Sequence, residues 1–125
     1  DVPGMSARGC MIWERSRWDQ SLLDFHRALI HFHRKSAALQ RGGFQVLVSE
    51  PDTVIYQREC PDERVLVIAH RADAARPAVP IPVYHGGISD GTRFADLLTG
   101  AVYSVHDGSL IVPELPQGAV ILRQI

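Results

Sequence analysis

The apolar residues of this 125-residue chain change their period once, at Gly42 and Gly43. Before the two glycines they recur at the three- and four-residue spacing of a helix, at Leu22, Phe25, Leu29 and Phe32. After the glycines they alternate along the chain, as in a strand, beginning at Phe44. A helix-period pattern is unstable as a strand, and the reverse also holds. The chain is therefore predicted to fold as one amphipathic helix followed by a β region.

The helical pattern covers about residues 16–35. Ser16 and Asp19 have the spacing of a capping box, and Asp19 is itself a candidate cap. Arg34 and Lys35 stand in the last turn, where positive charge is favoured by the helix dipole. The apolar arc spans roughly 220° at about 100° per residue, whereas one partner needs a stripe of about 100°. The helix is therefore expected to contact two neighbours.

Eight short segments after Gly43 are predicted as strands: 44–48, 54–58, 65–69, 78–84, 94–98, 101–105, 110–112 and 119–123. Pro80 and Pro82 cannot donate to a ladder, so their segment is expected at a sheet edge. Asp107-Gly108 favours a two-residue hairpin. Phe44 and Tyr56 fall on the apolar faces of their strands, which favours core positions. The pattern predicts an antiparallel sandwich or barrel.

Composition excludes several classes of partner. The formal net charge is −1, whereas a protein that holds nucleic acid through phosphates needs a basic surplus. The longest apolar run, Val65 to Ala69, is far shorter than the roughly 20 residues of a membrane span. The first residues lack a signal peptide's apolar stretch, and without an initiator Met the chain is expected to be a piece of a longer protein. Cys10 and Cys60 are expected to be reduced, in a cytoplasmic protein.

The histidines do not form a convincing metal site. His31 and His33 point to different sides of the predicted helix. His26 and His33 share a face, but that face is apolar and has no matching carboxylate, so core or interface packing is favoured. His85-Gly86-Gly87 is similar to the metal loop of cupins, yet the other ligands of a cupin site are missing. No metal and no cofactor are expected.

Catalytic groups are equally hard to place in this sequence. The acidic pairs Asp62-Glu63 and Glu50 with Asp52 stand in predicted turns. A glycosidase instead needs two carboxylates held across a concave site, one of them with a raised pKa. There is no GxSxG motif, and neither cysteine has the context of an activated thiolate. The chain on its own is therefore predicted not to be an enzyme.

The stretch RGCMIWERSRWDQSLLDFHRALIHFHRKSAAL resembles the last barrel segment of α-amylase superfamily glycoside hydrolases, in particular the cyclomaltodextrinase, neopullulanase and maltogenic amylase group. The matching positions are Arg8, Met11, Trp13, Glu14, Trp18, Asp19, Leu29, Ile30, Phe32, Ala38 and Leu39. Downstream, RGGFQVL, RVLVIAHRAD, DLLTG and LIVPELPQGAVIL resemble the entry and the strands of the family's C-terminal domain. The positions that depart from the family pattern are Cys10, His33, Ala37 and His70.

The resemblance implies a particular domain organisation. Residues 1–40 would be the loop and last helix of a (β/α)8 barrel, and 41–125 the complete C-terminal antiparallel sandwich with Greek-key connections. The family's three catalytic carboxylates have no counterpart in this sequence. Met11 and Trp13 would lie at the substrate rim of the barrel. The interface with the barrel would be formed by Trp18, Leu22, Phe25, Leu29 and Phe32.

Two functions follow, and they belong to different classes. The first is a non-catalytic C-terminal domain that stabilises the catalytic barrel of an α-glucan-cleaving glycoside hydrolase in carbohydrate metabolism. The second is a stand-alone carbohydrate-binding β-sandwich. Under the first, the partner is the barrel of the same parent protein, and α-glucan is contacted only in the intact enzyme. The exposed helix face of the isolated chain would also support a homo-oligomer.

Overall fold

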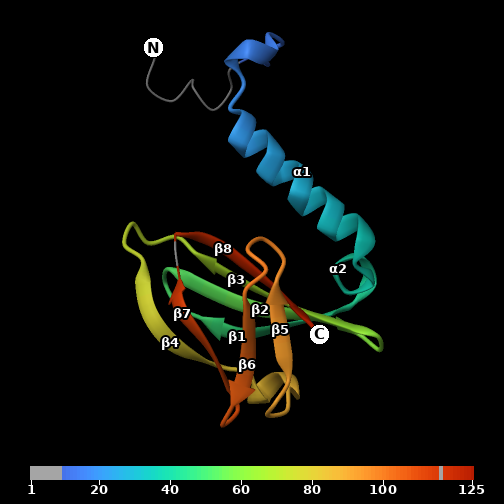
Figure 1. Cartoon of the computed structure of the whole chain (residues 1–125), viewed down its shortest axis with the longest axis vertical. Helices are drawn as coiled ribbons and strands as arrows, with labels where there is room; N and C mark the ends of the chain where they lie inside the picture. The colour runs from blue at the N-terminus through green and yellow to red at the C-terminus, as the bar shows by residue number, and fades with distance from the viewer. Residues whose placement is uncertain (1–9, 116) are drawn as a thin grey trace. The chain divides into compact units, whose positions relative to one another are not determined.

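The computed structural model describes residues 10–115 and 117–125, and the side chains of 76, 78 and 79 are outside the description. Arg8, which takes part in the resemblance, lies outside the described residues. The chain divides into two compact units, with the boundary between His31 and Phe32. The first unit contains the 3-10 helix η2 (Arg15–Arg17) and most of helix α1 (Gln20–Lys35). The second contains the end of α1, the short helix α2 (Ala37–Arg41) and all the strands (Figure 1).

Eight strands and one 3-10 turn make up the β region of the second unit. Their bounds are β1 Gly43–Ser49, β2 Thr53–Cys60, β3 Glu63–His70, β4 Arg76–Pro82, η3 Tyr84–Gly86, β5 Arg93–Asp96, β6 Val102–His106, β7 Ser109–Leu115 and β8 Gly118–Gln124. Every pairing is antiparallel, and the strands form one sheet in the order β1-β2-β3-β8-β5-β6-β7-β4. The prediction of a mainly-β fold of about eight antiparallel strands after one main helix is confirmed.

The last strand, β8, lies inside the sheet and not at its edge. It pairs with β3 through Leu66↔Leu122 and with β5 through Asp96↔Leu122. On the far side, β5, β6 and β7 follow one another, and β4 returns to lie beside β7. Three consecutive strands with a fourth returning to the outside form a Greek key. The chain therefore reaches its final topology only when β8 enters between two groups of strands.

A single apolar core fills the inside of the folded sheet. It takes side chains from β2, β3 and β8 in one half and from β4, β6 and β7 in the other. Its members are Ile55, Leu66, Ile68, Ile81, Val83, Ile88, Phe94, Val105, Leu110, Val112, Leu115, Val120 and Leu122. The end strands β1 and β4 contact one another. The sandwich is thus built by one continuous sheet whose halves face each other.

The edge and hairpin predictions agree with the pairing. β4, which contains Pro80 and Pro82, stands at one end of the strand order and pairs with β7. Asp107 and Gly108 join β6 to β7, with φ of 49° and 67°. Positive φ at both central residues is the conformation of a type I′ hairpin turn. Local turn chemistry is therefore sufficient to place this hairpin.

The prediction that Phe44 and Tyr56 are core residues is wrong. Phe44 is 64 % exposed and its ring lies 5.1 Å from that of Tyr56, on the face opposite the buried Ile55. The reason is a shift of register between Val46 and Val48, where β1 carries a bulge. A bulge reverses the side-chain alternation. Leu47 and Val48 therefore pack on the core while the start of β1 faces outward.

A carboxylate ends the long helix and begins the short one. Ser36 breaks the helical pattern after Lys35, and its Oγ accepts a hydrogen bond from Leu39 N–H at 3.0 Å as the cap of α2. Glu63 on β3 accepts from both Ser36 Oγ, at 2.9 Å, and Ala38 N–H, at 3.0 Å. The side chain of Glu63 therefore fixes α2 to the β2–β3 hairpin.

Gly42 separates α2 from β1 in a space that excludes a side chain. A Cβ at this position would lie 2.5 Å from Ala38 O and 2.6 Å from Glu59 O, whereas at Gly43 the nearest atom would be 3.8 Å away. We expect Gly42→Ala to lower the free energy of unfolding by about 1–3 kcal/mol, the usual cost of overpacking. Gly43→Ala is the matched control, because it reduces the freedom of the unfolded chain equally. Urea unfolding should separate the two variants, and equal midpoints would contradict the steric explanation.

Candidate functional site

Trp18 fixes the segment before the helix to the start of α1. Its indole Nε1–H donates to Ile12 O at 2.6 Å, and the Arg15 guanidinium carbon lies 5.9 Å from the centre of its ring. The short helix η2 places Trp18 in this position, since Arg17 N–H and Trp18 N–H bond back to Glu14 O and Arg15 O. A half-buried indole that uses its N–H in this way acts as a packing anchor.

Asp19 is the N-cap of α1. Its Oδ1 accepts from Leu22 N–H at 3.0 Å and from the Ser21 hydroxyl at 2.6 Å. The Ser21 hydroxyl, followed by the Leu22 N–H, holds the pKa of Asp19 below its ordinary value of 3.8. Of the two predicted caps, Asp19 is therefore the one used, while the Ser16 hydroxyl bonds to Glu14 at 3.1 Å.

An open apolar groove lies within the first unit, between the opening segment and the first turns of α1. It is lined by Cys10, Met11, Ile12, Arg17, Trp18, Asp19, Leu22, Leu23 and His26. Met11, Trp18 and Leu22, which were predicted for two different roles, thus share one groove. His26 donates from Nδ1 to Leu22 O at 2.8 Å and so takes a packing position in the wall.

The other predicted site residues do not line this groove. Trp13 is 80 % exposed, and Phe25 on α1 is also exposed, with its ring edge against His26 at 6.0 Å. Leu29 and Phe32 are half-buried. None of the residues 20–35 of α1 is buried. The apolar side chains of α1 are therefore exposed or half-buried.

A second apolar surface, which the sequence reading missed, lies on the outer face of β1 and β2. We call Phe44, Val46, Val54 and Tyr56 the outer patch. Val46 is directly paired with Tyr56, and Phe44 contacts the Tyr56 ring. Val46 is 46 % exposed, and Val54 is exposed beside it on β2. The bulge in β1 explains why Phe44 and Val46 face outward while Val48 packs on the core, which strict alternation from Phe44 to Val48 does not predict.

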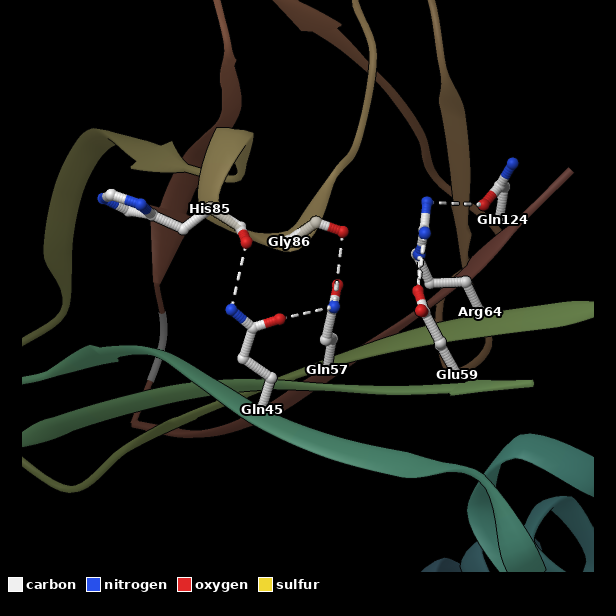
Figure 2. A network of polar contacts seen from close by, with 7 residues as sticks. All are labelled: Gln45, Gln57, Glu59, Arg64, His85, Gly86 and Gln124. Carbon is white, nitrogen blue, oxygen red and sulfur yellow. Dashed lines mark hydrogen bonds and ion pairs between the residues drawn. The ribbon is translucent and has the colours of Figure 1, made fainter. Parts of the chain in front are cut away.

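Two glutamines connect the start of the sheet to the turn after β4 (Figure 2). Gln57, which is buried, donates from Nε2 to Gln45 Oε1 at 3.0 Å and to Gly86 O at 3.3 Å. Gln45 donates from Nε2 to His85 O at 3.0 Å. A Cβ at Gly86 would lie 2.5 Å from Gln57 Oε1, so a side chain there would displace the Gln57 amide from its present position. The glutamines fix the main chain of η3 and leave its side chains outside.

The carboxylates near the β2–β3 hairpin serve the fold. Glu59 accepts from Arg64 at 2.8 and 2.5 Å, and Arg64 also reaches Gln124 on β8 at 3.5 Å (Figure 2). Glu63 is engaged by α2 as described. Among the described residues, no group of three or more His, Cys, Asp or Glu side chains could hold a metal ion.

Asp96 is a buried carboxylate with a structural role at the end of β5. It accepts from Leu98 N–H at 2.9 Å and from the Thr99 hydroxyl at 2.6 Å, so β5 ends at Asp96 and not at the predicted Leu98. Burial, and then the negative charge of Asp96, raise the pKa of Tyr103.

Within the described part of the chain, no helix is long and apolar enough to cross a membrane.

Comparison with known proteins places these features in context. No protein-family model matches the chain. A cyclomaltodextrinase of Geobacillus thermopakistaniensis is 26 % identical over 116 residues, which cover 91 % of this chain and 19 % of the relative. The chain thus spans about a fifth of the length of that curated relative.

Solved structures share the fold. An α-amylase from Anoxybacillus superposes with a TM-score of 0.74 at 22 % identity, over 86 % of this chain and 23 % of the amylase. An α-amylase from Geobacillus thermoleovorans, complexed with acarbose, has a TM-score of 0.79 at 14 % identity, over 94 % of this chain and 25 % of that one. The sequence and fold similarities together fit a fragment of an α-amylase-family enzyme, as the sequence resemblance predicted.

The cap of α1 generates a prediction about pH. Because the folded-state pKa of Asp19 is lowered, its contribution to helix stability is complete above the unfolded value of 3.8 and is lost as the pH falls through and below it. We expect the α1 amide signals in NMR to report helix fraying in this range. Asp19→Asn retains a good cap without a titrating group, so the same signals should lose their pH dependence. Fraying that is identical in this variant would contradict the assignment.

Proposed function

We propose that this chain is the C-terminal part of an α-glucan-cleaving glycoside hydrolase of the α-amylase family, and that it stabilises the catalytic barrel without taking part in catalysis. The proposal rests on the fact that the similarity covers most of this chain but only a small part of its relative, together with the exposed apolar side chains of α1 and the outer patch. The similarity extends over 91 % of this chain but only 19 % of a cyclomaltodextrinase. A chain of this kind is expected to contact the remaining part of the parent protein.

The proposal assigns the two parts of the sequence to different bodies of the parent. Residues 1–40 belong to the end of the barrel, and 41–125 form the C-terminal β domain. The apolar side chains of α1, with Trp18 as anchor, are the contact with the barrel: Leu22, Phe25, Leu29 and Phe32. Support comes from the absence of any buried residue within 20–35 of α1, since an amphipathic helix is stable chiefly through packing of its apolar face.

Met11 and Trp13 are proposed for the substrate rim of the intact enzyme. The support is exposure: both side chains are open to solvent, in contrast to the anchored Trp18. A cytoplasmic location is part of the same proposal, and it agrees with Cys10 and Cys60 as free thiols.

The outer patch is the proposed docking surface of the β domain. Contiguous exposed apolar side chains mark interaction surfaces more often than chance. Each large apolar side chain moved from water into an interface contributes up to about 1.5–3 kcal/mol. Docking through Phe44, Val46 and Val54 would therefore couple the stability of the β domain to that of the barrel.

The isolated chain is predicted to hydrolyse no glycosidic bond, because Glu59 and Glu63 are engaged in structural hydrogen bonds and the family's three catalytic carboxylates have no counterpart in this sequence. Incubation with maltotriose, pullulan and cyclodextrin should release no reducing sugar above a buffer blank.

Sequencing the reading frame upstream of this chain should reveal a barrel with three catalytic carboxylates. A stand-alone carbohydrate-binding module would have no such barrel, and release of sugar that is lost in a point mutant of this chain would overturn the non-catalytic assignment.

The outer patch gives a test of the stabilising role. Val46→Glu in the intact parent should lower the temperature of barrel unfolding by several degrees, because a charge replaces an apolar contact. In the isolated chain Val46 is 46 % exposed, so the same substitution should hardly change the urea midpoint. Ile111→Glu is the matched control: Ile111 lies on β7, outside the patch, and is 54 % exposed. Equal effects of the two substitutions in the parent would exclude docking through the patch.

A further inference from the structure

The turn η3 presents two aromatic rings to solvent. Tyr84 is 59 % exposed, and its ring centroid lies 3.9 Å from that of His85, with an angle of 42° between the planes. His85 is exposed as well. Figure 2 shows its ring pointing away from Gln45, which donates to its carbonyl, and from Gln57, which donates to the carbonyl of Gly86. At this separation the two rings are in tilted stacking contact, so each covers part of the other while both remain exposed at the surface; we call this pair the Tyr84–His85 platform.

The main chain beneath the platform is fixed at every step of the turn. Gly86 N–H bonds to Val83 O at 3.0 Å, and Gly87 N–H bonds to Tyr84 O at 3.1 Å. The carbonyls of His85 and Gly86 accept from Gln45 and Gln57 on β1 and β2. The rings are therefore displayed by a preformed turn, which reduces the entropy that binding would cost.

The tip of the β6–β7 hairpin stands against the platform. Val83 N–H donates to Gly108 O at 2.9 Å, and a Cβ on Gly108 would lie 3.3 Å from Tyr84 Cβ. Figure 1 shows η3 beside this hairpin. Gly108 has a φ of 67°, so a side chain here would both strain the turn and crowd Tyr84.

Carboxylates occur next to this hairpin tip. Asp90 accepts from Asp107 N–H at 3.0 Å and from Gly108 N–H at 2.8 Å. Each carboxylate oxygen retains a lone pair for a further donor. Asp107 is exposed at the same tip. An aromatic surface beside hydrogen-bond acceptors matches a ligand with one apolar face and a rim of hydroxyl donors.

We propose that the Tyr84–His85 platform is a sugar-binding site for a glucosyl unit of an α-glucan. The C–H face of the sugar packs on the Tyr84 ring. Its hydroxyl groups donate to Asp90 and Asp107 and exchange hydrogen bonds with the Tyr84 hydroxyl and the His85 ring. The choice of an α-glucan rests on the proposed function, whereas the site itself rests on the geometry. A sugar site on this chain departs from the expectation, given in the sequence analysis, that α-glucan is contacted only in the intact enzyme.

The test uses the full 125-residue chain and two trisaccharides. Maltotriose is titrated while backbone amide shifts are followed by heteronuclear NMR, and cellotriose is the β-linked comparison. The shifts should be largest at residues 84–87 and 107–108, and maltotriose should bind more tightly than cellotriose. Tyr84→Ala should weaken binding at least about tenfold, because it removes the stacking surface. His85→Ala should weaken it less.

Ile111→Ala is the matched control, because Ile111 is another exposed apolar residue and lies on β7, outside both the platform and the outer patch. It should leave the maltotriose affinity unchanged. Absence of shifts at residues 84–87, or an affinity that is the same in Tyr84→Ala, would overturn the proposal. Equal binding of both trisaccharides would overturn the α-glucan assignment. Each of these results leaves the docking role of the outer patch to its own test with Val46→Glu, so the two proposals fail separately.

Discussion

The backbone pairing of β8 with β3 on one side and with β5 on the other is the constraint on which the β unit depends. Without β8, the order β1-β2-β3-β8-β5-β6-β7-β4 separates into two groups of strands. Leu122, fully buried on β8, lies opposite Leu66 in one half and Asp96 in the other. The strand therefore closes the hydrogen-bonded sheet and completes the core. Because β3 and β8 are far apart in sequence, this pairing also carries a large loop-closure cost during folding.

The two candidate surfaces follow from this closure. Once the inner face of the sheet is filled by the core, the start of β1 has its apolar side chains on the other face, and the outer patch results. At another place, the buried Gln57 uses its amide to fix Gly86, so Tyr84 and His85 project from a rigid turn. One surface is apolar and suits a protein partner. The other is aromatic with polar neighbours and suits a sugar.

Much of the fold could be predicted from local pattern. The helix, the edge position of the segment with Pro80 and Pro82, and the Asp107-Gly108 hairpin each depend on residues close in sequence. The orientation of Phe44 could not, because it depends on a bulge that alternation alone does not reveal. The end of the long helix at Lys35 agrees with the prediction, but the short helix α2 was missed, since the carboxylate that stabilises its start belongs to Glu63, 27 residues away from Ser36.

The site was predictable to a similar degree. The role of Trp18 as an anchor follows from its position beside a helix start, and Met11 and Leu22 share its groove. The Tyr84–His85 platform was not predicted: Tyr84 was placed at the end of a predicted strand, and the turn is held by Gln45, 40 residues before His85 in the chain. Hydrogen bonds from residues far away in the sequence hold this turn, so the local sequence does not reveal that its side chains are displayed to solvent.

Native-state hydrogen exchange would test most directly whether β8 joins the sheet into one cooperative unit. The slowest amides of β3, on one side of β8, and of β7, in the other half, should share one opening free energy. That value should equal the free energy of unfolding from denaturant titration, as expected when exchange needs global opening. Exchange of the amides in β5, β6, β7 and β4 through a lower-energy opening, with β1, β2 and β3 still protected, would contradict this role of β8.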